Sequence, residues 1–190
     1  MEVIEMVINE NSETQGVYAV SVVEYPAIEE NWVALNKEII ELKSVDDEKR
    51  ILMGAALIPN KKILRRDKKI GEYMIYFTED TIRKTSELFL VRNNQNNATI
   101  EHQKEIDGMS VVESWIIEDT KLDKSQLYGF DLPVGTWMIS MKVYNDEIWN
   151  KVKAGEIKGF SIEGIYEANQ VQASKDEMMI EQIKELLKNL

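Results

Sequence analysis

The sequence predicts a mixed α+β fold in which strands outnumber helices. Several segments are rich in Val, Ile and aromatic residues, which favour strands, and Pro or Gly residues bound them. In some of them apolar and polar residues alternate, as in a strand with one buried face. The segment 32–42 fits a helix as well as a strand, and its strand-rich context favours a strand. The other expected strands cover residues 16–25, 51–58, 72–77, 111–118, 136–143 and 157–166.

Capping signals predict two helices among these strands. Thr78 is a favourable N-cap, and the acidic Glu79 and Asp80 suit the positive end of a helix dipole. We expect this helix to run to about residue 91. Asn145 is a second candidate N-cap, and Gly155 lies where a short helix after it would stop.

The end of the chain is expected to form a polar linker and an amphipathic helix. Ser174 and Glu177 form a capping box, and apolar residues follow at helical spacing. We therefore expect one domain over residues 1–167, a linker over 168–174 and a C-terminal amphipathic helix over 175–190. Such a helix fits a partner protein as well as its own domain.

The composition excludes several classes of protein. With 190 residues, the chain is long enough for one ordinary domain, and its net charge of −11 disfavours nucleic-acid binding. No apolar run approaches the roughly 20 residues of a membrane span, and the N-terminus lacks a secretory signal. One histidine and no cysteine make a metal site improbable, and we expect no cofactor. We interpret the basic cluster 61–69 as a solvated loop, with a patch that docks an acidic partner as the alternative. An intracellular location is the simplest interpretation of the composition.

His102 and Ser161 are the candidate reactive residues. A histidine can take and return a proton near neutral pH, and a serine needs such a base to attack a carbonyl. Each alone also fits an ordinary structural role. Gly159 and Gly164 flank Ser161 inside a strand, where glycine indicates a close approach of something else. Their spacing differs from that of the nucleophile elbow of α/β-hydrolases.

Two glutamates are candidate partners of the histidine. In the strand 111–118, alternation places Glu113 on the face of Val111 and Trp115, where a carboxylate requires a partner. Glu163 shares a strand face with Ser161. Two strand residues span roughly 6.6 Å, so the Glu163 carboxylate can also point away from the imidazole.

Seven blocks of sequence occur in the same order as in a known family. They include Thr99-Ile100-Glu101-His102 and Gly159-Phe160-Ser161-Ile162-Glu163-Gly164. From about residue 16 to 166 the chain resembles the prohead proteases of tailed phages, in particular a serine protease family in phage-like elements of Gram-positive bacteria. That family is similar in fold to the herpesvirus assemblins, which implies a mostly antiparallel β-barrel flanked by helices. The other matching blocks are residues 23–27, 54–60, 72–77, 112–116 and 135–138.

The resemblance implies roles for the candidate residues. Ser161 matches the nucleophile of the family and His102 its general base, for acyl transfer through an acyl-enzyme. Assemblins use a second histidine as the third member, and this chain has none. An acidic residue must then orient His102. We expect Glu113, which follows His102 closely on the next strand, with Glu163 as the rival.

The function implied by the resemblance is that of a serine endopeptidase in virion assembly. It would process phage scaffold protein, the major capsid protein, or both, and also itself, during procapsid maturation. The expected location is the procapsid, in the cytoplasm of the bacterial host. A homodimer is a further candidate, because assemblins act as dimers. The alternative is a non-catalytic module of the same fold that binds scaffold or capsid protein.

Overall fold

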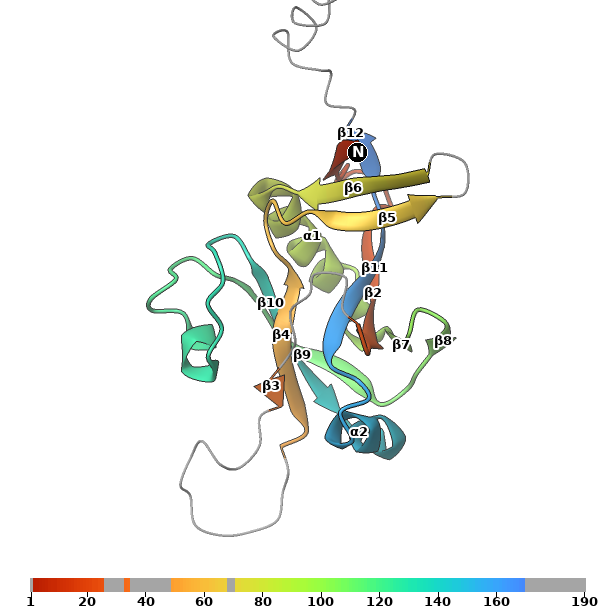
Figure 1. The fold of residues 1–190 in the computed structure, drawn as a ribbon, viewed down its shortest axis with the longest axis vertical. Helices are drawn as coiled ribbons and strands as arrows, with labels where there is room; N and C mark the ends of the chain where they lie inside the picture. Colours follow the sequence, from red (N-terminus) through yellow and green to blue (C-terminus); the bar gives the residue numbers. More distant parts are fainter. Residues whose placement is uncertain (1, 26–32, 35–48, 68–70, 170–190) are drawn as a thin grey trace, which may run out of the picture.

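Three four-stranded sheets make up most of the structure, a computed structural model that describes residues 2–25, 33–34, 49–67 and 71–169 (Figure 1). The strand orders are β12-β1-β6-β5, β3-β4-β10-β9 and β11-β2-β7-β8. The elements are β1 (Val3–Val7), β2 (Gly16–Val23), β3 (Val33–Ala34), β4 (Ile51–Leu57), β5 (Ile63–Asp67), β6 (Gly71–Phe77), α1 (Glu79–Val91), η2 (Asn94–Asn96), β7 (Ala98–Ile100), β8 (Lys104–Glu105), β9 (Met109–Ile116), η3 (Lys124–Tyr128), β10 (Trp137–Val143), α2 (Asp146–Lys153), β11 (Gly159–Ile165) and β12 (Glu167–Asn169).

The fold class is confirmed as a mixed α+β fold made mostly of strands, but the described sheets do not close into the expected β-barrel. Within the described residues each of the three sheets ends in two edge strands, so no sheet closes on itself. Several strands that follow one another in sequence belong to different sheets. For example, β8 is the edge strand of one sheet, where it pairs with β7, whereas β9 pairs with β10 in another sheet.

The helices begin and end where the capping signals predict. Thr78 accepts a hydrogen bond from the backbone N–H of Thr81, at the start of α1. Asn145 does the same for Ile148, at the start of α2. The expected C-terminal helix and most of the segment 32–42 lie outside the described residues. β12 occupies the point where a linker was expected, and it pairs with β1.

The hydrophobic core lies around β10 and β4. Every residue of β10 except Lys142 is buried, because β10 is paired on both sides and covered by α1. The rings of Phe89, from α1, and Trp137, from β10, meet edge to face with centroids 5.4 Å apart. This rigid layer supports the neighbouring sheet β11-β2-β7-β8.

The sheet β11-β2-β7-β8 is arranged around β2. β11 pairs antiparallel with one edge of β2, and β7 pairs parallel with the other. The Asn-rich segment before β7 is bound to β2 through side chains: Asn94 donates to the carbonyl of Val17 at 3.0 Å, and Asn97 donates to that of Tyr18 at 2.9 Å. These amides fix the start of β7 and therefore the position of the turn that follows it.

Residues 63–67 of the basic cluster form β5, one strand of a hairpin, which corrects the interpretation of this part as a solvated loop. β5 pairs antiparallel with β6, and Arg65 lies directly opposite Tyr73. In Figure 1 this hairpin crosses the end of the long β2–β11 pair. One face of β5 is consequently covered, with Ile63 only 4% exposed.

Candidate active site

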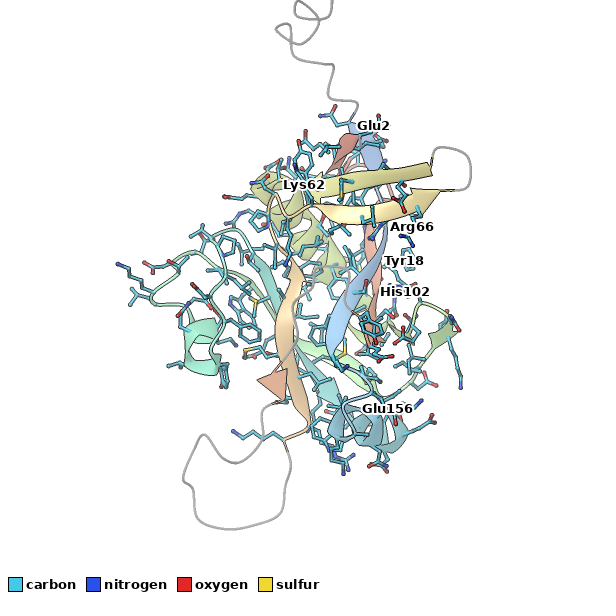
Figure 2. All side chains as sticks on the ribbon, in the orientation of Figure 1. Glu2, Tyr18, Lys62, Arg66, His102 and Glu156 are labelled. Carbon is cyan, nitrogen blue, oxygen red and sulfur yellow. The ribbon has the colours of Figure 1, made fainter. Side chains whose placement is uncertain are left out.

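The turn between β7 and β8 carries His102, which lies beside β2 and β11 (Figure 2). Three hydrogen bonds hold this turn against β2 and the residue that follows it. The backbone N–H of Glu101 donates to the carbonyl of Val22 at 3.1 Å, and that of His102 donates to Ser21 Oγ at 3.0 Å. In return, the carboxylate of Glu101 accepts from the backbone N–H of Glu24 at 2.7 Å. The turn is thus fixed at both of its central residues.

The backbone of this turn is strained. Glu101 and His102 have φ angles of 51° and 55°, in the left-handed region. Residues other than glycine are uncommon there and cost on the order of 1–3 kcal/mol each, and they cluster at functional sites. The three bonds to β2 maintain a conformation that points the His102 ring toward β11.

The imidazole of His102 contacts the carboxylate of Glu163. His102 Nδ1 and Glu163 Oε1 are 3.1 Å apart, and the hydroxyl of Thr99 donates to the same oxygen. Because a carboxylate oxygen accepts, this geometry favours the tautomer with the proton on Nδ1, which leaves Nε2 able to accept a proton. The Glu163 side chain is 15% exposed and the His102 side chain 43% exposed.

Ser161 lies on the same face of β11 as Glu163, two residues before it. It pairs directly with Ser21 of β2, and side chains opposite each other in an antiparallel pair share a face. Ser21 in turn accepts the His102 N–H. Ser161 is 6% exposed, and its hydroxyl has no hydrogen-bond partner among the described residues. The structure therefore places Ser161, His102 and Glu163 around Ser21, with Glu163 in contact with His102 and with no hydrogen bond between Ser161 and His102.

Glu113 lies in a different sheet, on β9. Its carboxylate accepts from Ser140 Oγ at 2.5 Å and lies 2.7 Å from the ammonium of Lys124. The hydrogen bond from Lys124, and then that from Ser140, lower the pKa of Glu113. Glu113 thus has the partner that its position requires, but the partner is Lys124. The expected preference for Glu113 over Glu163 beside His102 is reversed by the geometry, because β9 pairs with β10 and not with β7.

Close packing explains one of the two glycines near Ser161. A Cβ on Gly164 would lie 2.9 Å from the carbonyl oxygen of Gly16 and 2.9 Å from the ring of Tyr166. The prediction that something closely approaches this segment is confirmed at Gly164. The groups that approach Gly164 belong to this chain and not to a ligand. A bulge between Glu163 and Gly164 interrupts the pairing with β2 at this point.

Sequence reasoning missed two residues that support this site, Thr99 and Ser21. Thr99 lies in the Thr-Ile-Glu-His block, three residues before His102. A hydroxyl side chain at that position could have been recognised as a candidate hydrogen-bond donor to the site. Ser21 gave no such signal, since a serine within a Val-rich strand has many structural explanations. The described residues contain no group of three or more His, Asp and Glu side chains suited to a metal ion. Nor does this part of the chain contain a helix long and apolar enough to cross a membrane.

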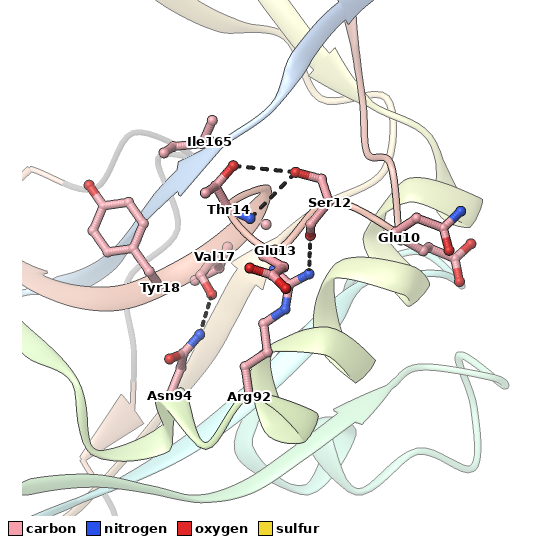
Figure 3. Close-up of a pocket in the computed structure, with 11 residues that line it drawn as sticks. Glu10, Ser12, Glu13, Thr14, Val17, Tyr18, Arg92, Asn94 and Ile165 are labelled. Carbon is pink, nitrogen blue, oxygen red and sulfur yellow. Dashed lines mark hydrogen bonds between the residues drawn. The ribbon is translucent and has the colours of Figure 1, made fainter.

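A separate hollow of about 620 Å³ lies at the start of β2 (Figure 3). It is lined by the loop that precedes β2 and by Arg92 and Asn94, and none of the three site residues reaches it. Arg92 donates to the carbonyls of Gln15 and Ser12. Figure 3 shows the guanidinium directed at this loop, so the arginine binds the loop to the end of α1.

A family model of serine proteases matches residues 38–172, a stretch that contains all three site residues. The family is described as "Putative phage serine protease XkdF", and because the match spans more than half of the chain, the chain belongs to it. The family assignment expected from the sequence is therefore confirmed. No curated protein and no solved structure matches the chain.

Proposed function

We propose that the protein is a serine endopeptidase with Ser161 as nucleophile, His102 as general base and Glu163 as the carboxylate that orients the base. The observation that carries this proposal is the 3.1 Å contact between Glu163 and His102 Nδ1, with Ser161 on the same strand face as Glu163. Membership of a phage serine protease family supports the reaction class.

The proposed mechanism follows from the tautomer that Glu163 favours. His102 Nε2 takes the proton of the Ser161 hydroxyl as Oγ attacks the peptide carbonyl, and Glu163 stabilises the imidazolium that forms. Collapse of the tetrahedral intermediate expels the amine, which takes the proton from His102. A water molecule then releases the acyl group by the same route. Thr99 holds the Glu163 carboxylate in position throughout.

The substrates we propose are phage scaffold protein, the major capsid protein and the protease itself, cleaved during procapsid maturation in the bacterial cytoplasm. This part of the proposal rests on the phage family and on the resemblance of the sequence to prohead proteases.

The second candidate function is a non-catalytic module that binds scaffold or capsid protein. One observation favours it: Ser161 is only 6% exposed, and a nucleophile must be reached by its substrate. Catalysis by Ser161 therefore requires the adjoining side chains to move aside when a peptide binds.

The Ser161→Ala variant distinguishes the two functions. Wild type and variant are each co-expressed with phage scaffold and capsid proteins, and the products are identified by mass spectrometry. The proposal expects processing by the wild type and none by Ser161→Ala, with binding and thermal stability retained. Ser110→Ala is the matched control, because Ser110 lies on β9 in another sheet. Processing that continues in Ser161→Ala would overturn the assignment of the nucleophile.

A further inference from the structure

An apolar groove of about 460 Å³ lies on one face of the sheet β12-β1-β6-β5, beside the end of β11. Residues that pair in register share a sheet face, as do residues four apart along a strand. Ala168 pairs with Met6 and Met6 with Phe77, whereas Tyr73, four residues before Phe77, pairs with Arg65. All five residues line the groove, which therefore crosses the sheet from one edge strand to the other.

This groove is separate from the candidate active site. Ile162 and Gly164 line it, and alternation along β11 places them on the face opposite to Ser161 and Glu163. A ligand in the groove would therefore not contact the proposed catalytic residues. The groove needs an occupant of its own.

Arg65 is the one charged residue among the described residues that line the groove. Burial lowers the pKa of its guanidinium below the ordinary value. Within the described part of the chain its hydrogen bond is to the carbonyl of Leu64, at 3.3 Å, and no carboxylate lies within ion-pair distance. A partly buried cation without an anion is costly, so the best occupant combines apolar side chains with one carboxylate.

The chain leaves the described residues at the rim of this groove. Ala168 lines it, and Asn169 is the last described residue. The sequence that follows predicts an amphipathic helix over residues 175–190, and a stripe of this kind is buried against another surface in a stable helix. The apolar residues of the stripe include Met178, Met179, Ile183, Leu186, Leu187 and Leu190.

One carboxylate of this segment lies on its apolar face. In a helix, residues three and seven apart share a face, and Asp176 precedes Met179 by three residues and Ile183 by seven. Glu181, by contrast, lies on the opposite face. Asp176 is therefore the carboxylate that can enter the groove together with the apolar stripe.

The dimensions of the groove and of the segment agree. With strands about 4.8 Å apart and a rise of about 3.3 Å per strand residue, Ala168 and Arg65 are separated by roughly 20 Å on the diagonal of the sheet. A helix over residues 175–190 is about 24 Å long at 1.5 Å per residue. From Ala168 to Asp176 an extended chain spans up to about 26 Å, so Asp176 can reach Arg65.

We propose that this groove is the intramolecular docking site of residues 175–190, whose apolar side chains fill it and whose Asp176 forms an ion pair with Arg65. The helix then returns along the groove from Arg65 toward Ala168. The proposal is independent of the protease function, because the groove and the candidate active site lie on opposite faces of β11.

The first test is photocrosslinking within the full-length chain. The sequence has no cysteine, so Ile183→Cys carries a single benzophenone label on the apolar face of the segment. We expect crosslinks to groove residues such as Met6 and Tyr73 in the monomer, identified by mass spectrometry. Glu181→Cys is the matched control, because its label lies on the polar face and should lose most of these crosslinks. Crosslinks that join two chains, or that lie outside the groove, would overturn the proposal.

Hydrogen exchange in the full-length chain tests the ion pair. Amides of residues 178–190 exchange when the segment undocks, so their protection measures the docking equilibrium. Asp176→Asn and Arg65→Gln should each lower this protection about tenfold, as expected for a charge-assisted hydrogen bond, and the double variant should lose little more. Arg66→Gln is the matched control, because it removes the same charge from an exposed residue that is paired with Glu72.

The Asp176→Asn variant keeps this test decisive if Arg65→Gln disturbs the sheet. It changes none of the described contacts, so a loss of protection in it reports undocking of the segment. Protection that stays unchanged in Asp176→Asn, or that is already absent in the wild type, contradicts the proposal.

Discussion

Glu163 and Glu113 have similar hydrogen-bond partners, and yet only Glu163 lies beside the candidate base, His102. Each accepts a hydrogen bond from a hydroxyl on a neighbouring strand, Thr99 for Glu163 and Ser140 for Glu113. Each also contacts one nitrogen-bearing side chain, and there they differ. Glu163 contacts the imidazole of His102, whereas Glu113 contacts the ammonium of Lys124. Imidazoles as a class serve as general bases, and ammonium groups do not.

This comparison shows that the same arrangement of carboxylate and hydroxyl can serve either structure or reactivity. The exposure of the two side chains differs accordingly, at 15% for Glu163 and 47% for Glu113. A less exposed carboxylate orients a ring more strongly, because water competes less for its oxygens. The side chain that contacts the carboxylate, an imidazole or an ammonium, therefore decides whether the pair can take part in proton transfer.

The largest expected effect is the loss of activity in Glu163→Gln. The amide cannot hold the His102 tautomer or stabilise an imidazolium, so kcat should fall about 10²–10⁴-fold while KM stays nearly constant. The measurement is the steady-state cleavage of a peptide that the wild type processes. Glu113→Gln is the control and should retain nearly full activity. If both variants lost activity equally, the distinction between the two carboxylates would be wrong.

The distinction between these two carboxylates could not be drawn from the sequence. Local signals were sufficient for the caps at Thr78 and Asn145 and for six of the twelve described strands, because propensity and capping depend on nearby residues. Which strands pair with one another in a sheet depends instead on tertiary packing. Glu113 follows His102 closely in the chain, yet β9 pairs with β10, whereas the distant β11 joins the sheet of β7 through β2.

The ordered sequence blocks selected Ser161 and His102 as candidate residues, whereas the geometry between them could not be predicted. The two-residue spacing of Ser161 and Glu163, roughly 6.6 Å along a strand, counted against Glu163 in the sequence. The His102 turn lies over that strand face, bound to Ser21, and this brings the imidazole to the Glu163 carboxylate. The β5–β6 hairpin was missed for a similar reason, because a run of basic residues indicates a solvated loop unless pairing with another strand covers one of its faces.

The hydroxyls that hold the two carboxylates provide the next prediction. Thr99→Val keeps the shape of the side chain but removes the donor to Glu163, so kcat should fall about 5–30-fold, corresponding to about 1–2 kcal/mol. Thr99→Ser should restore most of the activity, which a purely structural role in packing would not predict. Ser140→Ala removes the equivalent donor to Glu113 and should leave kcat unchanged. Peptide cleavage at saturating substrate measures all three.

A smaller effect is expected at Ser21, which supports the strained turn. Ser21→Ala leaves the backbone N–H of His102 without its acceptor, at a cost of about 1–3 kcal/mol in the free energy of unfolding. Activity should fall as well, because the strained Glu101–His102 turn loses one of its three bonds to β2. Urea denaturation gives the stability, and cleavage assays give the activity. A variant with unchanged stability and activity would show that Glu101 alone holds the turn.

The smallest expected effect concerns Glu113, whose contribution to the free energy of unfolding should depend on pH. Lys124 and Ser140 lower the pKa of Glu113 from its ordinary 4.5, so its ionised form stabilises the folded state. That contribution is complete above the pKa of the unfolded chain and is lost as the pH falls through the lower, folded pKa. The difference in stability between wild type and Glu113→Gln should therefore be largest near neutral pH and shrink steadily from about pH 5 downward. Urea unfolding across this range measures it, with Lys124→Met expected to show the same loss. A difference that grows toward acid would mean that the ion pair does not stabilise the fold.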